Sequence, residues 1–111
     1  MTVSTHVLDT SIGRPAGSVH VRLLRHHAAV EWVEVADDRT NVDGRIHWPS
    51  EDGELIPGIY RLTFDIGAYF ASRGVDTFYS GVAVEFVARE DTHYHVPLLV
   101  SPYGYSTYRG S

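Results

Sequence analysis

The chain has 111 residues, enough for one domain with a real hydrophobic core, and its hydrophobic share of 43% and charged share of 21% are ordinary for a soluble globular protein. The net charge of −5 and the lack of any basic block argue against a nucleic-acid partner, and no apolar run approaches the roughly 20 residues that a membrane span needs. The absence of cysteine excludes disulfides and thiolate chemistry and, with an N-terminus unlike a signal peptide, favours a cytoplasmic location.

Four short strands are expected in the first half of the chain, because apolar and polar side chains alternate there with a period of two. Their ranges are Thr5–Asp9, Ser18–Leu24, Ala29–Val35 and Arg45–Trp48. In the second strand, the residues expected to face inward are Val19, Val21 and Leu23. The Gly and Pro content predicts a loop over 11–17, and the stretches 37–40 and 42–44 predict turns.

The second half continues the strand pattern and contains the best candidate for a helix. A polar loop over 50–58 precedes a strand at Ile59–Ile66, in which Tyr60, Leu62 and Phe64 share one face. The helix is expected at Gly67–Arg73 and is only about two turns long. Another alternating strand follows at Val82–Val87.

The last nineteen residues predict a β-hairpin, because two runs rich in β-branched and aromatic residues flank a type I turn at 101–104. In that pairing one face carries His95, Pro97, Leu99, Ser106, Tyr108 and Gly110, a mixture that suggests a site or an interface. The other face is expected to join the core and carries Tyr94, Val96, Leu98, Val100, Tyr105, Thr107 and Arg109. About eight short strands and one short helix predict an all-β fold, a β-sandwich.

Three motifs resemble those of one enzyme family. The most specific is the C-terminal segment, which ends in Tyr108-Arg109-Gly110-Ser111. The stretches 6–10 with 13–16, and 40–45, are similar to the family's other two motifs. On these residues the chain resembles the 5-hydroxyisourate hydrolases, the transthyretin-like enzymes of urate breakdown, from about Thr5 to its last residue.

The resemblance implies a transthyretin-like (prealbumin-like) sandwich of two four-stranded sheets, with a helix after the fifth strand and residues 1–111 forming a single hydrolase domain. It also implies a homotetramer, a dimer of dimers, in which the last strands join two chains edge to edge and two dimers enclose a central channel. Pro97 agrees physically, because it lacks an N–H and its strand cannot be paired regularly on both sides there.

The implied activity is hydrolysis of a small purine-derived substrate, 5-hydroxyisourate, to 2-oxo-4-hydroxy-4-carboxy-5-ureidoimidazoline, without a metal or cofactor. Water attacks the C6 carbonyl, the N1–C6 bond breaks and the six-membered ring opens. The resemblance assigns the catalytic roles to His6, Arg45 and His95. It assigns substrate binding to His6 and Arg45 together with Tyr108 and Ser111.

Taken without the resemblance, the same residues have other interpretations. His93 and His95 could be exposed strand residues, or with His6 as a third ligand they could chelate zinc or copper. Arg45 could be a solvated turn residue, although a guanidinium also suits the carbonyl oxygens of a flat heterocycle. A serine nucleophile, Ser106 or Ser111, lacks a Gly-x-Ser-x-Gly elbow and is less favoured than direct attack by water.

Two functions outside catalysis stay open at this stage. One is a transthyretin-like carrier that binds a flat aromatic ligand in the central channel without chemistry. Tyr108 and the two histidines argue against it, because a carrier would need a wider and more apolar channel mouth. The other is a structural or adhesive sandwich domain, which leaves the terminal motif unexplained.

Overall fold

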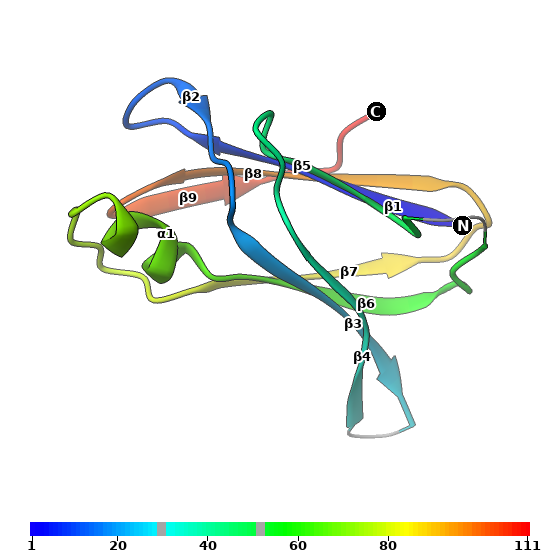
Figure 1. Cartoon of the computed structure of the whole chain (residues 1–111). Coiled ribbons are helices and arrows are strands. Elements are labelled where there is room, and N and C mark those ends of the chain that lie inside the picture. The colour runs from blue at the N-terminus through cyan, green and yellow to red at the C-terminus, as the bar shows by residue number, and fades with distance from the viewer. Residues whose placement is uncertain (29–30, 51–52) are drawn as a thin grey trace.

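Two β-sheets pack face to face in the computed structural model, which describes residues 1–28, 31–50 and 53–111 (Figure 1). The elements are β1 (Thr2–Asp9), β2 (Arg14–Pro15), β3 (His20–His27), β4 (Glu31–Arg39), β5 (Arg45–Trp48), β6 (Gly58–Phe64), α1 (Ile66–Ser72), β7 (Val82–Ala88), β8 (His93–Ser101) and β9 (Gly104–Thr107). Sheet A has the order β2-β1-β8-β9, with β5 also paired to β1, so in the described part of the chain it has five strands rather than the expected four. Sheet B has the expected four, in the order β4-β3-β6-β7. The predicted β-sandwich is confirmed.

The core lies between the sheets and is built by strict alternation. In β1 every second residue is buried, from Val3 to Asp9, and in β6 the predicted inward face is confirmed. Fully burying a large apolar side chain contributes roughly 1.5–3 kcal/mol to folding. The largest fully buried side chains include Tyr60, Phe64, Phe70, Leu23, Leu62, Ile66 and Leu98.

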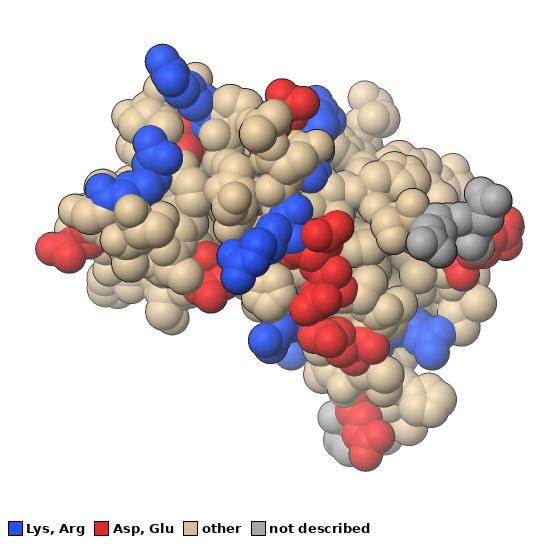
Figure 2. Space-filling view, in the orientation of Figure 1, with Lys and Arg blue, Asp and Glu red and all other residues tan. Residues whose placement is uncertain are grey.

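The predicted turn at 37–40 is wrong over most of its length, because β4 continues to Arg39. The register of β3 with β4 shifts between Leu23 and Leu24, so one extra residue on β4 bulges out and the pairing then resumes. Figure 2 shows acidic side chains along this outer strand, where such charges discourage pairing with another chain. The first two residues of the strand predicted at Ala29–Val35 lie outside the described residues.

The loop expected over 11–17 contains the two-residue strand β2, which pairs with the end of β1. The helix begins one residue earlier than predicted, at Ile66, because the Asp65 carboxylate accepts a hydrogen bond from the Ala68 N–H at 3.2 Å and caps it. No helix in the described part of the chain is long and apolar enough to cross a membrane.

Helix α1 is joined to sheet A by a buried hydrogen bond. The Tyr69 hydroxyl donates to Oδ2 of Asp9 at 2.9 Å, and Asp9 is only 1% exposed. The other carboxylate oxygen, Oδ1, accepts from the Ser11 N–H and hydroxyl. Burial, together with the Asp9 bond, raises the pKa of Tyr69 to about 12, so the phenol keeps its proton at neutral pH.

We expect Tyr69→Phe to lower the free energy of unfolding by about 1–3 kcal/mol, because it leaves a buried carboxylate oxygen without its donor. Urea unfolding measures the change. Tyr79→Phe is the matched control, since no hydrogen bond of the Tyr79 hydroxyl is found among the described residues. An equal loss in both variants would show that the Asp9 bond is not the cause.

The terminal hairpin has the predicted register, with Leu98 opposite Thr107 and an isolated bridge between His95 and Gly110. Regular pairing of β9 with β8 ends at Thr107. The next position lies opposite Pro97, which has no N–H to donate, so the end of the pairing there agrees with the prediction. The inward side of β8 is buried as expected. The matching side of the last segment is not buried, and the prediction is wrong for Tyr105, Thr107 and Arg109. Thr107 and Arg109 border a hollow that separates this segment from β7.

Candidate functional site

Polar side chains of three adjacent strands share the outward surface of sheet A. They point outward because the residues between them in β1, such as Val3, Thr5 and Val7, are buried. We call this set the outer polar face. Its members are Thr2, Ser4 and His6 from β1, Arg45 and His47 from β5, and His93 and His95 from β8.

Strand pairing brings the three predicted catalytic residues together on this face. His6 lies opposite Arg45 across the β1–β5 ladder. On the other side of β1, Ser4 lies opposite His95 and His6 lies opposite Pro97, so His6 and His95 are diagonal neighbours. Residues 6, 45 and 95 are therefore placed on adjacent strands, although they are far apart in the sequence.

The turn before β5 fixes the position of Arg45. The side-chain oxygen Oδ1 of Asn41 accepts hydrogen bonds from the backbone N–H of Asp43 at 2.9 Å and of Arg45 at 3.0 Å. Gly44 has φ +75°, and a Cβ there would lie 2.4 Å from the Val7 carbonyl oxygen, so only glycine fits. The Val7 N–H donates to the Gly44 carbonyl at 2.7 Å and ties the turn to β1.

The electrostatics of the face favour neutral imidazoles. Partial burial lowers the pKa of His6 and of His95 below the ordinary 6.5, and the nearby Arg45 guanidinium lowers both further. The backbone carbonyl of Asp43 and the charge of its carboxylate raise the pKa of His6 in part. Within the described residues, no carboxylate lies at ion-pair distance from Arg45. The face thus presents two neutral rings and one cation.

The His95 ring is held along two of its edges. Ser4 Oγ lies 2.7 Å from Nδ1. On the other edge, the Gly110 N–H donates to the His95 carbonyl at 2.8 Å, and a Cβ at position 110 would lie 2.4 Å from Cδ2 of the ring. These contacts leave Nε2 as the ring nitrogen that neither neighbour occupies.

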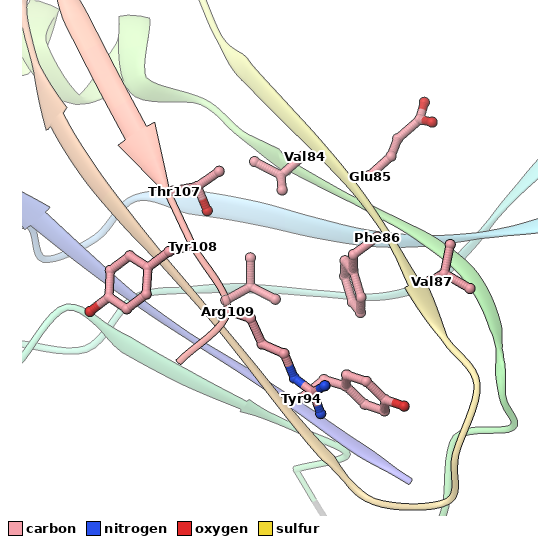
Figure 3. Close-up of a pocket in the computed structure, with 9 residues that line it drawn as sticks. Val84, Glu85, Phe86, Val87, Tyr94, Thr107, Tyr108 and Arg109 are labelled. Atoms are coloured by element: carbon pink, nitrogen blue, oxygen red, sulfur yellow. The ribbon is translucent and has the colours of Figure 1, made fainter. Parts of the chain in front are cut away.

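Tyr108 and Ser111, the other two predicted binding residues, are not joined to this cluster within one chain. Tyr108 is 60% exposed and borders a hollow of about 240 Å³ between β7 and the terminal hairpin (Figure 3). In the same view the Arg109 side chain lies near Tyr94, with its guanidinium 4.7 Å from the ring centroid. Over the described ranges, no hydrogen bond or ion pair connects Tyr108 or Ser111 to His6, Arg45 or His95.

A second, more polar hollow, also of about 240 Å³, adjoins Arg45 itself and is lined in part by Ser4 and His47. The apolar hollow at the hairpin is the better enclosed of the two, yet its charged groups, Glu85 and Arg109, lie apart from the two histidines. The imidazoles and the Arg45 guanidinium are what proton transfer and anion stabilisation require, so we take the outer polar face as the candidate site.

The alternative metal site does not form in the described part of the chain. No three His, Asp or Glu side chains there are placed so that they could hold one ion. His93 and His95 instead share a hydroxyl, because Ser4 Oγ contacts a ring nitrogen of each. The zinc or copper interpretation of His6, His93 and His95 therefore has no ligand set here.

Sequence reasoning missed Thr2, Ser4 and His47, and it named His93 only as a possible metal ligand. The signal for two of them was present, because counting back by two from His6 gives Ser4 and counting forward by two from Arg45 gives His47. His93 lies two residues before His95 on the same strand, so it faces the same way. Their contacts depend on the β1–β8 register, which no local pattern reveals.

Comparisons with known proteins agree over the whole fold. The chain matches the profile of the HIUase/Transthyretin family over residues 3–110. A probable 5-hydroxyisourate hydrolase of Caenorhabditis elegans is 46% identical over 111 residues, covering 99% of this chain and 82% of that protein. The structure of Klebsiella pneumoniae 5-hydroxyisourate hydrolase matches with a TM-score of 0.86 and 40% identity, covering 100% of both chains. Transthyretin from Sparus aurata matches with a TM-score of 0.89 and 32% identity, covering 97% of this chain and 95% of its own. The predicted transthyretin-like sandwich is thereby confirmed, and the chain belongs to the HIUase/Transthyretin family.

Proposed function

We propose that residues 1–111 form a hydrolase domain that acts on 5-hydroxyisourate in urate degradation. Water attacks the C6 carbonyl and the N1–C6 bond breaks. The ring-opened product, 2-oxo-4-hydroxy-4-carboxy-5-ureidoimidazoline, is then released. The observation that carries the proposal is the convergence of His6, Arg45 and His95 on the outer polar face. Relatives named as 5-hydroxyisourate hydrolases support the choice of substrate.

Each of the three residues has a role that its chemistry suits. One imidazole takes a proton from the attacking water, and the other gives a proton to the leaving nitrogen N1. Both rings are neutral near pH 7, so each has one nitrogen that accepts and one that donates. Arg45 binds the carbonyl oxygens of the flat substrate and stabilises the negative charge that develops on the C6 oxygen.

The working form is, in this proposal, a homotetramer built as a dimer of dimers. Support comes from the outer strands β7 and β9, which border an apolar hollow and expose Val87 by 47% and Tyr105 by 44%. A second chain that covers this edge would bury both residues. The central channel would then bring Tyr108 and Ser111 to the site and complete the substrate pocket. The cytoplasmic location remains a prediction.

The proposal is tested by adding the purified chain to freshly generated 5-hydroxyisourate and following the absorbance of the substrate. We expect its loss to accelerate in proportion to enzyme concentration, with one equivalent of ring-opened product formed. A carrier would instead bind a stoichiometric amount of the ligand and leave its rate of decay unchanged. That outcome would overturn the proposed function.

The pH dependence of the reaction follows from the lowered pKa values. A base that must be neutral loses activity as it takes up a proton, so kcat/KM should fall at low pH, with the half-point below pH 6.5. Stability should change in the same direction. The unfolded histidines take up protons from about pH 6.5, before the folded ones do, so the free energy of unfolding falls as the pH drops further. A kcat/KM profile between about pH 5 and pH 8 measures the effect, and a half-point above 6.5 would contradict it.

Gly110→Ala should misplace the catalytic ring without unfolding the chain. The new Cβ would lie 2.4 Å from Cδ2 of His95, so the ring must move. A displacement of about 1 Å in a catalytic group can cost about 10²-fold in rate, and we expect kcat to fall by that order. Gly104→Ala in the same hairpin is the matched control, since its Cβ would meet only ordinary contact with Ser101. Equal kcat values in the two variants would contradict the proposed packing.

A further inference from the structure

A serine hydroxyl connects the two histidines of β8. Ser4 Oγ lies 2.8 Å from Nε2 of His93 and 2.7 Å from Nδ1 of His95. The Thr2 hydroxyl is hydrogen-bonded to the other nitrogen of His93, Nδ1. The four side chains form one continuous hydrogen-bonded chain across β1 and β8, which we call the Thr2–His95 chain.

The single hydrogen of the Ser4 hydroxyl couples the protonation of the His93 and His95 rings. A neutral imidazole has one N–H, and the Ser4 hydroxyl has one hydrogen. When Ser4 donates to Nδ1 of His95, that ring carries its proton on Nε2, and His93 donates to Ser4 from its own Nε2. When Ser4 donates to Nε2 of His93, His95 donates from Nδ1, and His93 donates from Nδ1 to Thr2. In both arrangements the rings carry their protons on the same kind of nitrogen.

The surroundings keep both rings neutral, as this coupling requires. Burial lowers the pKa of His93 and of His95. The His47 ring, stacked on His93 with centroids 5.5 Å apart and 9° between the planes, lowers the pKa of His93 further. The nearby Arg45, His93 and His6 lower the pKa of His95 further. The Ser4 backbone carbonyl raises it in part.

We propose that Ser4 and His93 are positioning residues that determine which ring nitrogen of His95 carries the proton. The inference rests on the proposed function, in which the free Nε2 of His95 faces the reaction. With its proton on Nδ1, His95 is a base, and with its proton on Nε2 it is an acid. Among the described residues, Gly110 does not bias this choice, because it approaches only the carbon edge of the ring.

One concerted shift interconverts the two forms without charging either ring. Nε2 of His95 takes a proton from water, and Nδ1 gives its proton to Ser4 Oγ. The Ser4 hydroxyl proton passes to Nε2 of His93, and the Nδ1 proton of His93 passes to Thr2 Oγ1. The original Thr2 hydroxyl proton leaves to bulk water, since the Thr2–His93 contact is exposed. The net result is hydroxide at the site and a proton in solvent.

The first test uses the protein without substrate, so it does not depend on the proposed function. Long-range ¹H–¹⁵N correlation spectra of the intact protein at about pH 8 report which nitrogen of each neutral imidazole carries the proton. We expect His93 and His95 to be protonated on the same kind of nitrogen, and Ser4→Ala to shift the signals of both. Protonation on different nitrogens in the unmodified protein would overturn the proposal.

The second test is kinetic. Ser4→Ala should lower kcat by about tenfold or more, as is typical when the partner that fixes a histidine tautomer is lost, while KM changes little. Ser4→Thr keeps the hydroxyl and should restore most of kcat. Ser72→Ala, which removes a hydroxyl in helix α1, is the control and should keep the full rate. A Ser4→Ala variant at the full rate, or a Ser4→Thr variant as slow as Ser4→Ala, would refute the positioning role. If the unmodified protein does not hydrolyse 5-hydroxyisourate, the proposed function is refuted instead. The spectra would still show whether the protonated nitrogens of His93 and His95 are coupled.

Discussion

Replacing His95 by asparagine should lower kcat for 5-hydroxyisourate by about 10²–10⁴-fold, the range in which a positioned acid or base contributes to catalysis. Asparagine keeps a polar group near the Nδ1 position, so the contact with Ser4 can persist. It has no group that takes up a proton near neutral pH. KM should change little, because the variant keeps Arg45, the substrate-binding residue in the proposed mechanism. Steady-state kinetics with freshly generated substrate measures both constants.

The control for this variant is His27→Asn, which removes an exposed histidine at the end of β3, away from the outer polar face. It should keep kcat within about twofold of the unmodified protein, as surface substitutions usually do little. His6→Asn should behave like His95→Asn, because the proposed mechanism divides the acid and base roles between the two rings. A near-normal kcat in both the His6→Asn and the His95→Asn variants would refute the proposed mechanism.

Arg45→Gln should lower kcat by about 10²–10³-fold, the usual cost of removing one donor to a developing oxyanion. The substitution also removes the cation that lowers the pKa of His6 and His95. The acid half-point of kcat/KM should therefore move up toward pH 6.5. Two effects in one variant, a slower reaction and a shifted pH profile, identify Arg45 as the charge that faces both rings.

Arg45→Lys separates charge from geometry. Lysine keeps the positive charge but not the planar, bidentate donor pair. We expect the pH profile to stay near that of the unmodified protein while kcat recovers only in part. Arg89→Gln, at an exposed position after β7, should change neither quantity. An unshifted profile in Arg45→Gln would contradict the placement of the guanidinium.

Local sequence patterns predict most of the strands of this fold because each strand alternates buried and exposed side chains. The terminal hairpin shows this best, since its turn alone predicted the register that pairs Leu98 with Thr107. The same reasoning failed where burial depends on distant strands. Thr107 and Arg109 were expected to join the core, yet both are exposed because a hollow lies between them and β7.

The candidate site could be predicted only in part for the same reason. The family motifs named His6, Arg45 and His95, but their meeting depends on β1 pairing with β5 on one side and in parallel with β8 on the other. Parallel pairing of strands about ninety residues apart leaves no periodic signal in either strand. The Ser4–His93 contact follows from that pairing and was therefore beyond local reasoning.

The central claim, that hydrolysis takes place at the outer polar face of sheet A, is tested most directly by one kinetic comparison. Turnover of 5-hydroxyisourate is measured for the unmodified chain and for a variant that combines His6→Asn, Arg45→Gln and His95→Asn, after circular dichroism shows that both have the same fold. We predict rapid turnover by the first protein and, for the second, a rate indistinguishable from that of the uncatalysed reaction. Rapid turnover by the combined variant would place the chemistry elsewhere on the molecule.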